Sequence, residues 1–160
     1  MITGLVRTFD SIVKFVEQSV TDLSEQQMVE QPTGVPNHGT WTLRHIIYSC
    51  QGIAAEPGVE RWLPDDWESA FGYGSTPSSD LSRYPKKSEM LTLLADAASR
   101  LRQALLAANE PVLRQSLPDE TLPTMSHLLL QVVVAHTAYH AGQLALWRRA
   151  IGKQSVAVFI

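Results

Sequence analysis

The sequence has almost no cysteine, no long apolar run and no leader-like stretch. Its single cysteine, Cys50, cannot form an internal disulfide bond, which excludes a disulfide-stapled secreted scaffold. The most apolar run, residues 128–135, is interrupted by Gln131 and is far shorter than the roughly 20 residues that span a bilayer. The first ten residues lack the apolar stretch of a signal peptide. We therefore predict a soluble, cytoplasmic protein with no membrane contact.

The sequence also lacks an excess of charge of one sign. Thirteen Lys and Arg residues stand against 16 Asp and Glu residues, and the formal net charge is -3. This balance gives no electrostatic footprint for nucleic acid or for an anionic membrane, so we predict a small-molecule partner and no nucleic acid. A chain of 160 residues is long enough for one buried core and short for two. We predict that residues 1–160 form a single domain.

Strand patterns are nearly absent as well, apart from a possible short strand at residues 155–160. Apolar residues instead recur with helical spacing in four segments, at about residues 5–23, 40–56, 88–109 and 124–152. Ser24 is predicted to cap a short extra turn after the first segment, and Thr40 to cap the second. Four amphipathic helices in one domain predict an all-α four-helix bundle.

The link between the second and third helices is much longer than an antiparallel hairpin needs. It spans residues 57–87 and carries several aromatic side chains, among them Trp67 and Phe71. A link of this length can cross the whole bundle, so the second and third helices can run in the same direction, which gives an up-down-down-up order. We expect its aromatic residues to pack over one end of the bundle. The alternative is that they also line a ligand pocket.

Two histidines, His136 and His140, lie four residues apart in the fourth helical segment. Positions i and i+4 of an α-helix share one face with Cβ atoms about 5–6 Å apart, so both imidazoles can bind one metal ion. Tyr139 and Gln143 fall in the same broad apolar stripe, which predicts that the pair points inward. A pair supplies only part of a metal site, and the alternative is two buried histidines satisfied by ordinary polar partners.

Three features together resemble the DinB/YfiT-like metalloproteins, which include metal-dependent hydrolases. They are Trp41-Thr-Leu-Arg-His-Ile-Ile at the start of the second helix, the long crossover, and His136-Thr-Ala-Tyr-His140-Ala-Gly-Gln-Leu in the fourth helix. The resemblance spans nearly the whole chain, and His-x3-His-x-Gly-Gln is its most specific part. It implies an up-down-down-up bundle, commonly a homodimer, in which three histidines hold zinc or nickel. His136 and His140 are then two of the ligands. The apolar character of the second and fourth helices is secondary support for the dimer.

The third ligand of the family pattern falls on Ser49 in this sequence, and serine is a poor zinc ligand. His45 lies one turn earlier, and its direction on a helical wheel differs from that of Ser49 by only about 40°, so it is the natural substitute. The same wheel places His45 well away from the centre of the buried stripe, which argues against it. His38 and His127 are weaker candidates, with capping or surface roles expected. If no histidine serves, the site is degenerate and free of metal.

A three-histidine site leaves a coordination position open, as in catalytic zinc sites. An open Lewis acid can activate water for hydrolysis or bind a thiolate and deliver it to an electrophile, and some relatives resemble transferases that use low-molecular-weight thiols. No carboxylate lies one turn from either helix-four histidine to act as a base, so thiol transfer is preferred. We predict that the open position is bordered by Tyr48, Ser49, Tyr139 and Gln143.

The competing hypothesis is a non-catalytic, stress-related helical bundle that binds a ligand and carries a degenerate metal site. Absence of the usual helix-two histidine favours it. Histidine must be neutral to bind a metal, so metal stabilisation is expected to fade below about pH 6, judged against the ordinary histidine pKa of about 6.5.

Overall fold

The computed structural model describes residues 2–56 and 58–156. Within this part the chain is all-helical, and its only β feature is an isolated bridge between Ser116 and Thr124. The predicted all-α class is confirmed. Ser155 and Val156 belong to no strand, and residues 157–160 of the possible C-terminal strand lie outside the described residues.

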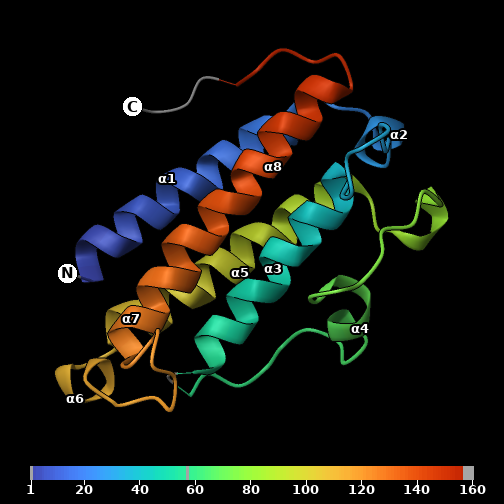
Figure 1. Ribbon diagram of the computed structural model, residues 1–160. Coiled ribbons are helices and arrows are strands. Elements are labelled where there is room, and N and C mark those ends of the chain that lie inside the picture. Colours follow the sequence, from blue (N-terminus) through green and yellow to red (C-terminus); the bar gives the residue numbers. More distant parts are fainter. Residues whose placement is uncertain (1, 57, 157–160) are drawn as a thin grey trace.

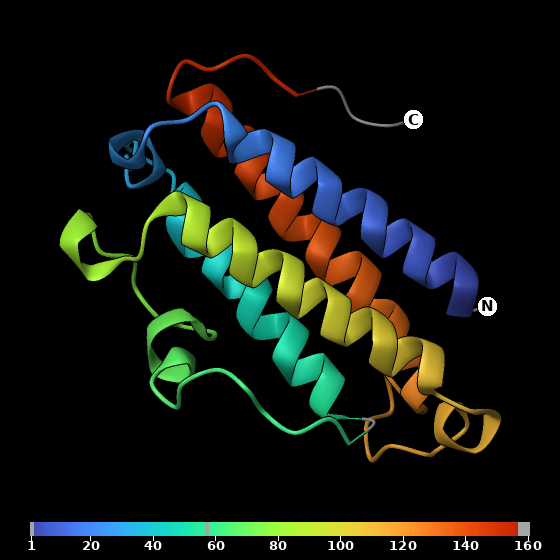
Figure 2. The same ribbon diagram turned by 180° about the vertical axis from the view of Figure 1, so that it is seen from behind.

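Four long helices lie side by side and enclose the core (Figures 1 and 2). They are α1 (Ile2–Thr21), α3 (Gly39–Ala55), α5 (Lys87–Ala107) and α8 (Thr137–Ala150). Helices α1 and α3 each contact both α5 and α8, so the apolar stripes of all four helices meet in one core. The shorter elements are α2 (Glu25–Met28), α4 (Trp67–Phe71), η1 (Leu81–Arg83), α6 (Glu110–Leu113), α7 (Met125–Leu129) and η2 (Leu130–His136). None of the described helices has the length and apolarity needed to cross a membrane.

Of the two N-caps predicted from the sequence, one is confirmed and the other is wrong. Ser24 forms the predicted capping box: its hydroxyl accepts from the backbone of Gln27, whose side chain accepts from the backbone of Ser24. The prediction that Thr40 caps the second helix is wrong. Helix α3 begins at Gly39, and the ring Nδ1 of His38 accepts from the backbone of Trp41 at 3.2 Å. His38 therefore has the predicted capping role, although it is fully buried.

The periodicity of the fourth helical segment predicted one continuous α-helix, and this prediction is wrong. It contains α7, then the π-helix η2 over Leu130–His136, and then α8. The hydroxyl of Thr137 donates to the carbonyl of Val132, five residues earlier, as expected for the wider turn. π-Helical turns are rare in proteins, but those that occur are often found at functional sites. This one ends at His136.

The crossover between α3 and α5 runs back along the side of α3 (Figure 1). Four side chains in or next to α3 form hydrogen bonds with the crossover, and the later residues of the crossover pair with the earlier residues of α3. Gln51 accepts from the backbone N–H groups of Trp62 and Leu63, and His45 donates to the carbonyl of Phe71. Trp41 donates to the hydroxyl of Ser75, and His38 donates to the carbonyl of Ser78. The expectation that the aromatic residues pack over a bundle end is therefore wrong. The crossover, α5 and α8 together cover α3, and every residue from Gly39 to Ile47 is buried.

Candidate metal centre

Three histidines from two parts of the chain meet beside the crossover. His45 comes from α3, His136 ends the π-helix η2, and His140 lies in the first turn of α8. Each offers one ring nitrogen, and these nitrogens all lie within 4.8 Å of one another. The structure thus brings together the three predicted ligands. His45 and His140 are buried, whereas His136 is partly exposed.

The wheel argument that turned His45 away from the protein interior is wrong, because its side chain is only 7% exposed. A helical wheel records the position of a residue on its own helix and nothing of what covers that face. Here the ring stacks on Trp41, with the ring centroids 4.9 Å apart and the planes within 8°. The crossover closes the same face from outside, because the carbonyl of Phe71 lies 2.5 Å from His45 Nδ1.

Hydrogen bonds to the outer ring nitrogens of His45 and His140 fix which nitrogen these two imidazoles turn inward. A carbonyl can only accept, so His45 Nδ1 donates its proton to Phe71 and leaves a lone pair on Nε2. His140 Nδ1 likewise lies 2.8 Å from Gln143 Oε1 and donates to it, which leaves its Nε2 free to bind a metal. Such partners on the outer nitrogen are typical of metal-bound histidines.

The inward nitrogens are spaced as a metal site requires. Nε2 of His136 lies 3.3 Å from Nε2 of His45 and 3.1 Å from Nε2 of His140. Ligands about 2.0–2.1 Å from a tetrahedral zinc ion are themselves roughly 3.3 Å apart. His136 Nε2 carries at most one proton and can donate it to only one of its two neighbours. In at least one of the two close Nε2–Nε2 contacts, the lone pairs of both nitrogens therefore face each other without a proton between them. A shared cation would relieve that repulsion, and the residues present therefore fit a divalent metal.

The protonation state of the cluster also suits a metal. Burial, and then the nearby His45, lowers the pKa of His136 from 6.5 to about 4. Burial, followed by both neighbouring histidines, lowers the pKa of His140 to about 3 despite its bond to Gln143. Burial lowers the pKa of His45 as well. All three rings are therefore neutral near pH 7, the form that binds metal, and the pH below which metal binding fades should lie lower than the 6 expected from an ordinary histidine.

The predicted pocket residues have different surroundings. Gln143 orients His140, as described above, and Tyr139 is 62% exposed with its ring edge against His140 at 5.1 Å. Ser49 is partly buried, and its hydroxyl donates to the carbonyl of His45 within α3. Tyr48 is partly buried against the core. The weaker ligand candidate His127 is exposed, and its ring bonds the hydroxyl of Thr124.

A cavity of about 390 Å³ opens beside the histidine cluster, between the C-terminal half of α3 and the segment that leads into α8. Its lining consists of Ser49, Gly52, Ile53, Ala55, Glu56, Arg61, Leu128, Val132 and His136. His136 is the member of the cluster that reaches it. Glu56 supplies a carboxylate that inspection of the fourth helix alone missed, because it comes from the far end of α3. Spacing within one helix carried no signal for it.

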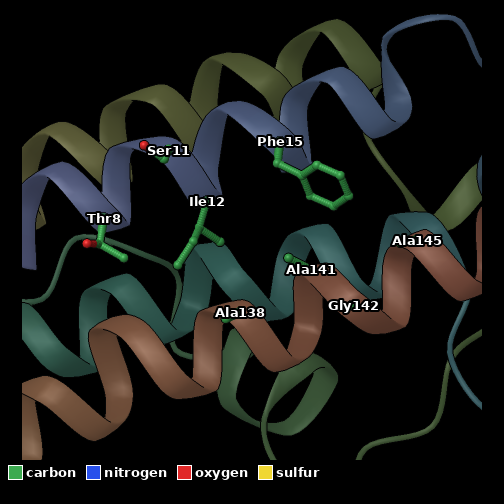
Figure 3. Close-up of a pocket in the computed structure, with 8 residues that line it drawn as sticks. All are labelled: Thr8, Ser11, Ile12, Phe15, Ala138, Ala141, Gly142 and Ala145. Carbon is green, nitrogen blue, oxygen red and sulfur yellow. The ribbon is translucent and has the colours of Figure 1, made fainter. Parts of the chain in front are cut away.

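A second cavity, of about 360 Å³, lies between α1 and α8 (Figure 3). Ile12 and Phe15 project from α1 over small residues of α8, among them Ala141 and Gly142. None of its lining residues carries a titratable group. This groove therefore offers shape and apolar contact but no catalytic chemistry.

Cys50, the single thiol, contributes nothing to the cluster. It is buried, and its burial raises the pKa of the thiol to about 12. It is therefore protonated near pH 7 and is no nucleophile.

The comparisons with known proteins give one match. The model of a family described as the DinB superfamily matches residues 14–144, an interval that includes all three histidines and the whole crossover. No curated protein and no solved structure is significantly similar to the chain.

Proposed function

The chain belongs to the DinB superfamily, and from that premise we propose that it is an enzyme whose His45, His136 and His140 hold one divalent metal ion, zinc or nickel. The observation that carries the proposal is the convergence of three ring nitrogens within 4.8 Å. Two of the three rings have their outer nitrogen occupied by Phe71 or Gln143. This arrangement orients donors toward one point, which histidines that merely fill a core do not need.

The proposed reaction is transfer of a low-molecular-weight thiol to a small electrophile. A divalent ion held by His45, His136 and His140 would supply a Lewis acid that lowers the pKa of a thiol. Ile53, Leu128 and Val132 give the adjoining cavity an apolar wall for the carbon skeleton of the electrophile. The sulfur forms a bond to an electrophilic carbon, the leaving group departs with its bonding electrons, and the thiol proton passes to solvent.

Hydrolysis is the second candidate, and Glu56 is the observation that favours it. Glu56 lines the same cavity as His136, and its carboxylate is a group that can accept a proton from an attacking water. A substitution of Glu56 distinguishes hydrolysis from thiol transfer. Glu56→Gln should abolish hydrolysis and leave thiol transfer nearly unchanged, because the second reaction needs no carboxylate base.

The test measures both reactions on zinc-loaded and nickel-loaded protein. Conjugation of cysteine to 1-chloro-2,4-dinitrobenzene reports thiol transfer, and release of p-nitrophenol from p-nitrophenyl acetate reports hydrolysis. We expect a metal-dependent rate in the first assay that is lost in His136→Ala and retained in His127→Ala, which changes an exposed histidine. Rates equal to those without protein in both assays, together with no bound metal, would favour the non-catalytic bundle with a degenerate site.

We also propose the up-down-down-up order for the four long helices. Lys87, the first residue of α5, donates from Nζ to the carbonyls of Val20, Thr21 and Leu23 at the end of α1. Helix α5 therefore starts where α1 ends. The crossover has by then returned along α3, which supports the same direction for α3 and α5.

A homodimer remains a proposal that rests on the family. The apolar character of α3 no longer supports it, because α3 is covered by α5, α8 and the crossover of its own chain. Static light scattering at tens of micromolar protein tests the proposal. A mass twice that of the 17.7 kDa chain is expected, and the mass of a single chain would reject the dimer.

A further inference from the structure

Arg44 is a buried cation without a buried anion. Its side chain is only 9% exposed, and its Nε has no hydrogen-bond partner among the described residues. Within the same part of the chain, no carboxylate lies within ion-pair distance of it. Removing a guanidinium from water without a counter-charge costs several kcal/mol in general, so such a group needs a reason to be there.

A second buried arginine shows how this fold satisfies such a group. Arg148 is 6% exposed, and its guanidinium contacts both carboxylate oxygens of Asp22 at 2.6 and 2.8 Å. It also donates to the carbonyls of Ser19 and Gln154. Arg148 thus makes four hydrogen bonds inside the protein, whereas the Nε of Arg44 has no partner among the described residues.

Aromatic rings surround Arg44. Its Cζ lies 4.3 Å from the ring centroid of Trp67, 4.0 Å from that of Phe71 and 5.9 Å from that of Tyr84. Rings stacked on a guanidinium stabilise its charge but accept no hydrogen bond in its plane. The in-plane N–H groups are therefore what Arg44 has left for a ligand.

Arg44 lines a cavity of about 250 Å³ between α3, α4 and the later part of the crossover. Its lining consists of Arg44, Asp66, Ser69, Ala70, Phe71, Thr76, Ser78, Arg83 and Tyr84. None of these residues lines the cavity beside His136, so the two sites are separate. Phe71 connects this cavity to the histidine cluster, because its ring contacts Arg44 and its carbonyl accepts a hydrogen bond from His45.

We propose that this cavity is a binding site for a small monocarboxylate anion, held by Arg44 and Arg83. Two arginines against the single carboxylate of Asp66 leave one net positive charge, which one carboxylate neutralises. The planar N–H edge of a guanidinium matches a carboxylate with two parallel hydrogen bonds. Asp66 disfavours a doubly charged phosphate by repulsion. A ligand that fixes Phe71 also fixes the carbonyl that orients His45, so the anion supports the geometry of the histidine cluster.

The test titrates the full chain with sodium acetate, sodium phosphate or sodium chloride at constant ionic strength. The readout is the Nε–H signals of the arginines in two-dimensional ¹H–¹⁵N NMR, with Arg44→Lys used to assign the signal of Arg44. We expect acetate to shift that signal saturably and to raise the melting temperature, because a ligand that binds only the folded state stabilises it. Chloride should do neither.

Two variants at exposed positions keep the test decisive even if Arg44→Lys fails to fold. Arg83→Gln should raise the Kd for acetate about tenfold, the equivalent of one charge-assisted hydrogen bond, and Asp66→Asn should lower the Kd. Arg114→Gln, a change to an exposed arginine paired with Glu110, is the matched control and should leave the Kd unchanged. Equal responses to acetate and chloride, or equal Kd values in all three variants, would overturn the proposal.

Two further outcomes test which anion the cavity binds and whether anion binding is independent of the metal site. Tighter binding of phosphate than of acetate would overturn the carboxylate assignment. His136→Ala removes a proposed metal ligand but no residue of this cavity, so acetate should still bind that variant. Loss of acetate binding in His136→Ala would contradict a separate site.

Discussion

Acidification should destabilise the metal-free protein through its buried histidines. In the folded chain the pKa values of His136 and His140 are lowered from 6.5 to about 4 and about 3. In the unfolded chain both side chains titrate near 6.5. Between about pH 6.5 and pH 4 the unfolded state therefore binds more protons than the folded state, and the free energy of unfolding falls as the pH falls. Above pH 6.5 both states are neutral and this effect is absent.

The size of the effect follows from the number of protons. Each proton bound only by the unfolded state contributes about 1.4 kcal/mol per pH unit, so two histidines give a slope approaching roughly 2.7 kcal/mol per unit near pH 5. Summed down to pH 4.5, the loss is on the order of 4 kcal/mol, a large part of the stability of a typical domain. The Arg148 hydrogen bond holds the pKa of Asp22 below 3.8, so loss of that ion pair lies below this window.

The assay is urea unfolding of EDTA-treated protein at pH 7.5, 6.5, 5.5 and 4.5. The double variant His136→Leu with His140→Leu should show a much shallower slope, because it has no buried imidazole to protonate at these positions. His127→Ala, at an exposed position, should keep the wild-type slope. An unfolding free energy that stays constant from pH 6.5 to 4.5, or an equal slope in the double variant, would refute the reasoning.

Three further predictions follow from single contacts. Gln143→Ala removes the acceptor that orients His140, so zinc affinity measured by competition with a chromogenic chelator should fall about 10- to 100-fold, and an unchanged affinity would show that this contact is dispensable. Ser49→His should leave zinc affinity in titration calorimetry nearly unchanged, because His45 already supplies the third ligand; a marked gain would mean that the present site is incomplete. Gly39→Ala places a Cβ only 2.5 Å from the buried ring of Trp147, so the free energy of unfolding in urea should drop by about 1–3 kcal/mol, and full stability would show that the ring can yield.

The sequence was informative about features that depend on neighbours within one helix. Apolar spacing located α1, α3 and α5 to within a few residues, although it merged α7, η2 and α8 into one helix. The i,i+4 spacing of His136 and His140 placed both in one cluster. The capping box at Ser24 is also a local motif. Each of these features is determined by contacts over three or four residues, which a single sequence displays directly.

Features that depend on the crossover could not be predicted in this way. The helical wheel could not predict that His45 is buried, because the residue that covers it, Phe71, lies 26 positions further along the chain. Glu56 and His136 come to one cavity from different helices for the same reason. The π-helix before His136 has no period that distinguishes it from α-helix in so short a segment, and so it was missed.

The central claim is that three histidines hold one divalent metal ion, and metal analysis tests it most directly. Protein purified without an affinity tag, with its metal content measured by mass spectrometry, should carry close to one zinc or nickel ion per chain. His45→Ala and His136→Ala should each lose most of that metal, whereas Ser49→Ala and His127→Ala should retain it. Wild-type protein that stays metal-free after incubation with zinc and nickel, or His45→Ala that retains a full complement, would contradict the account.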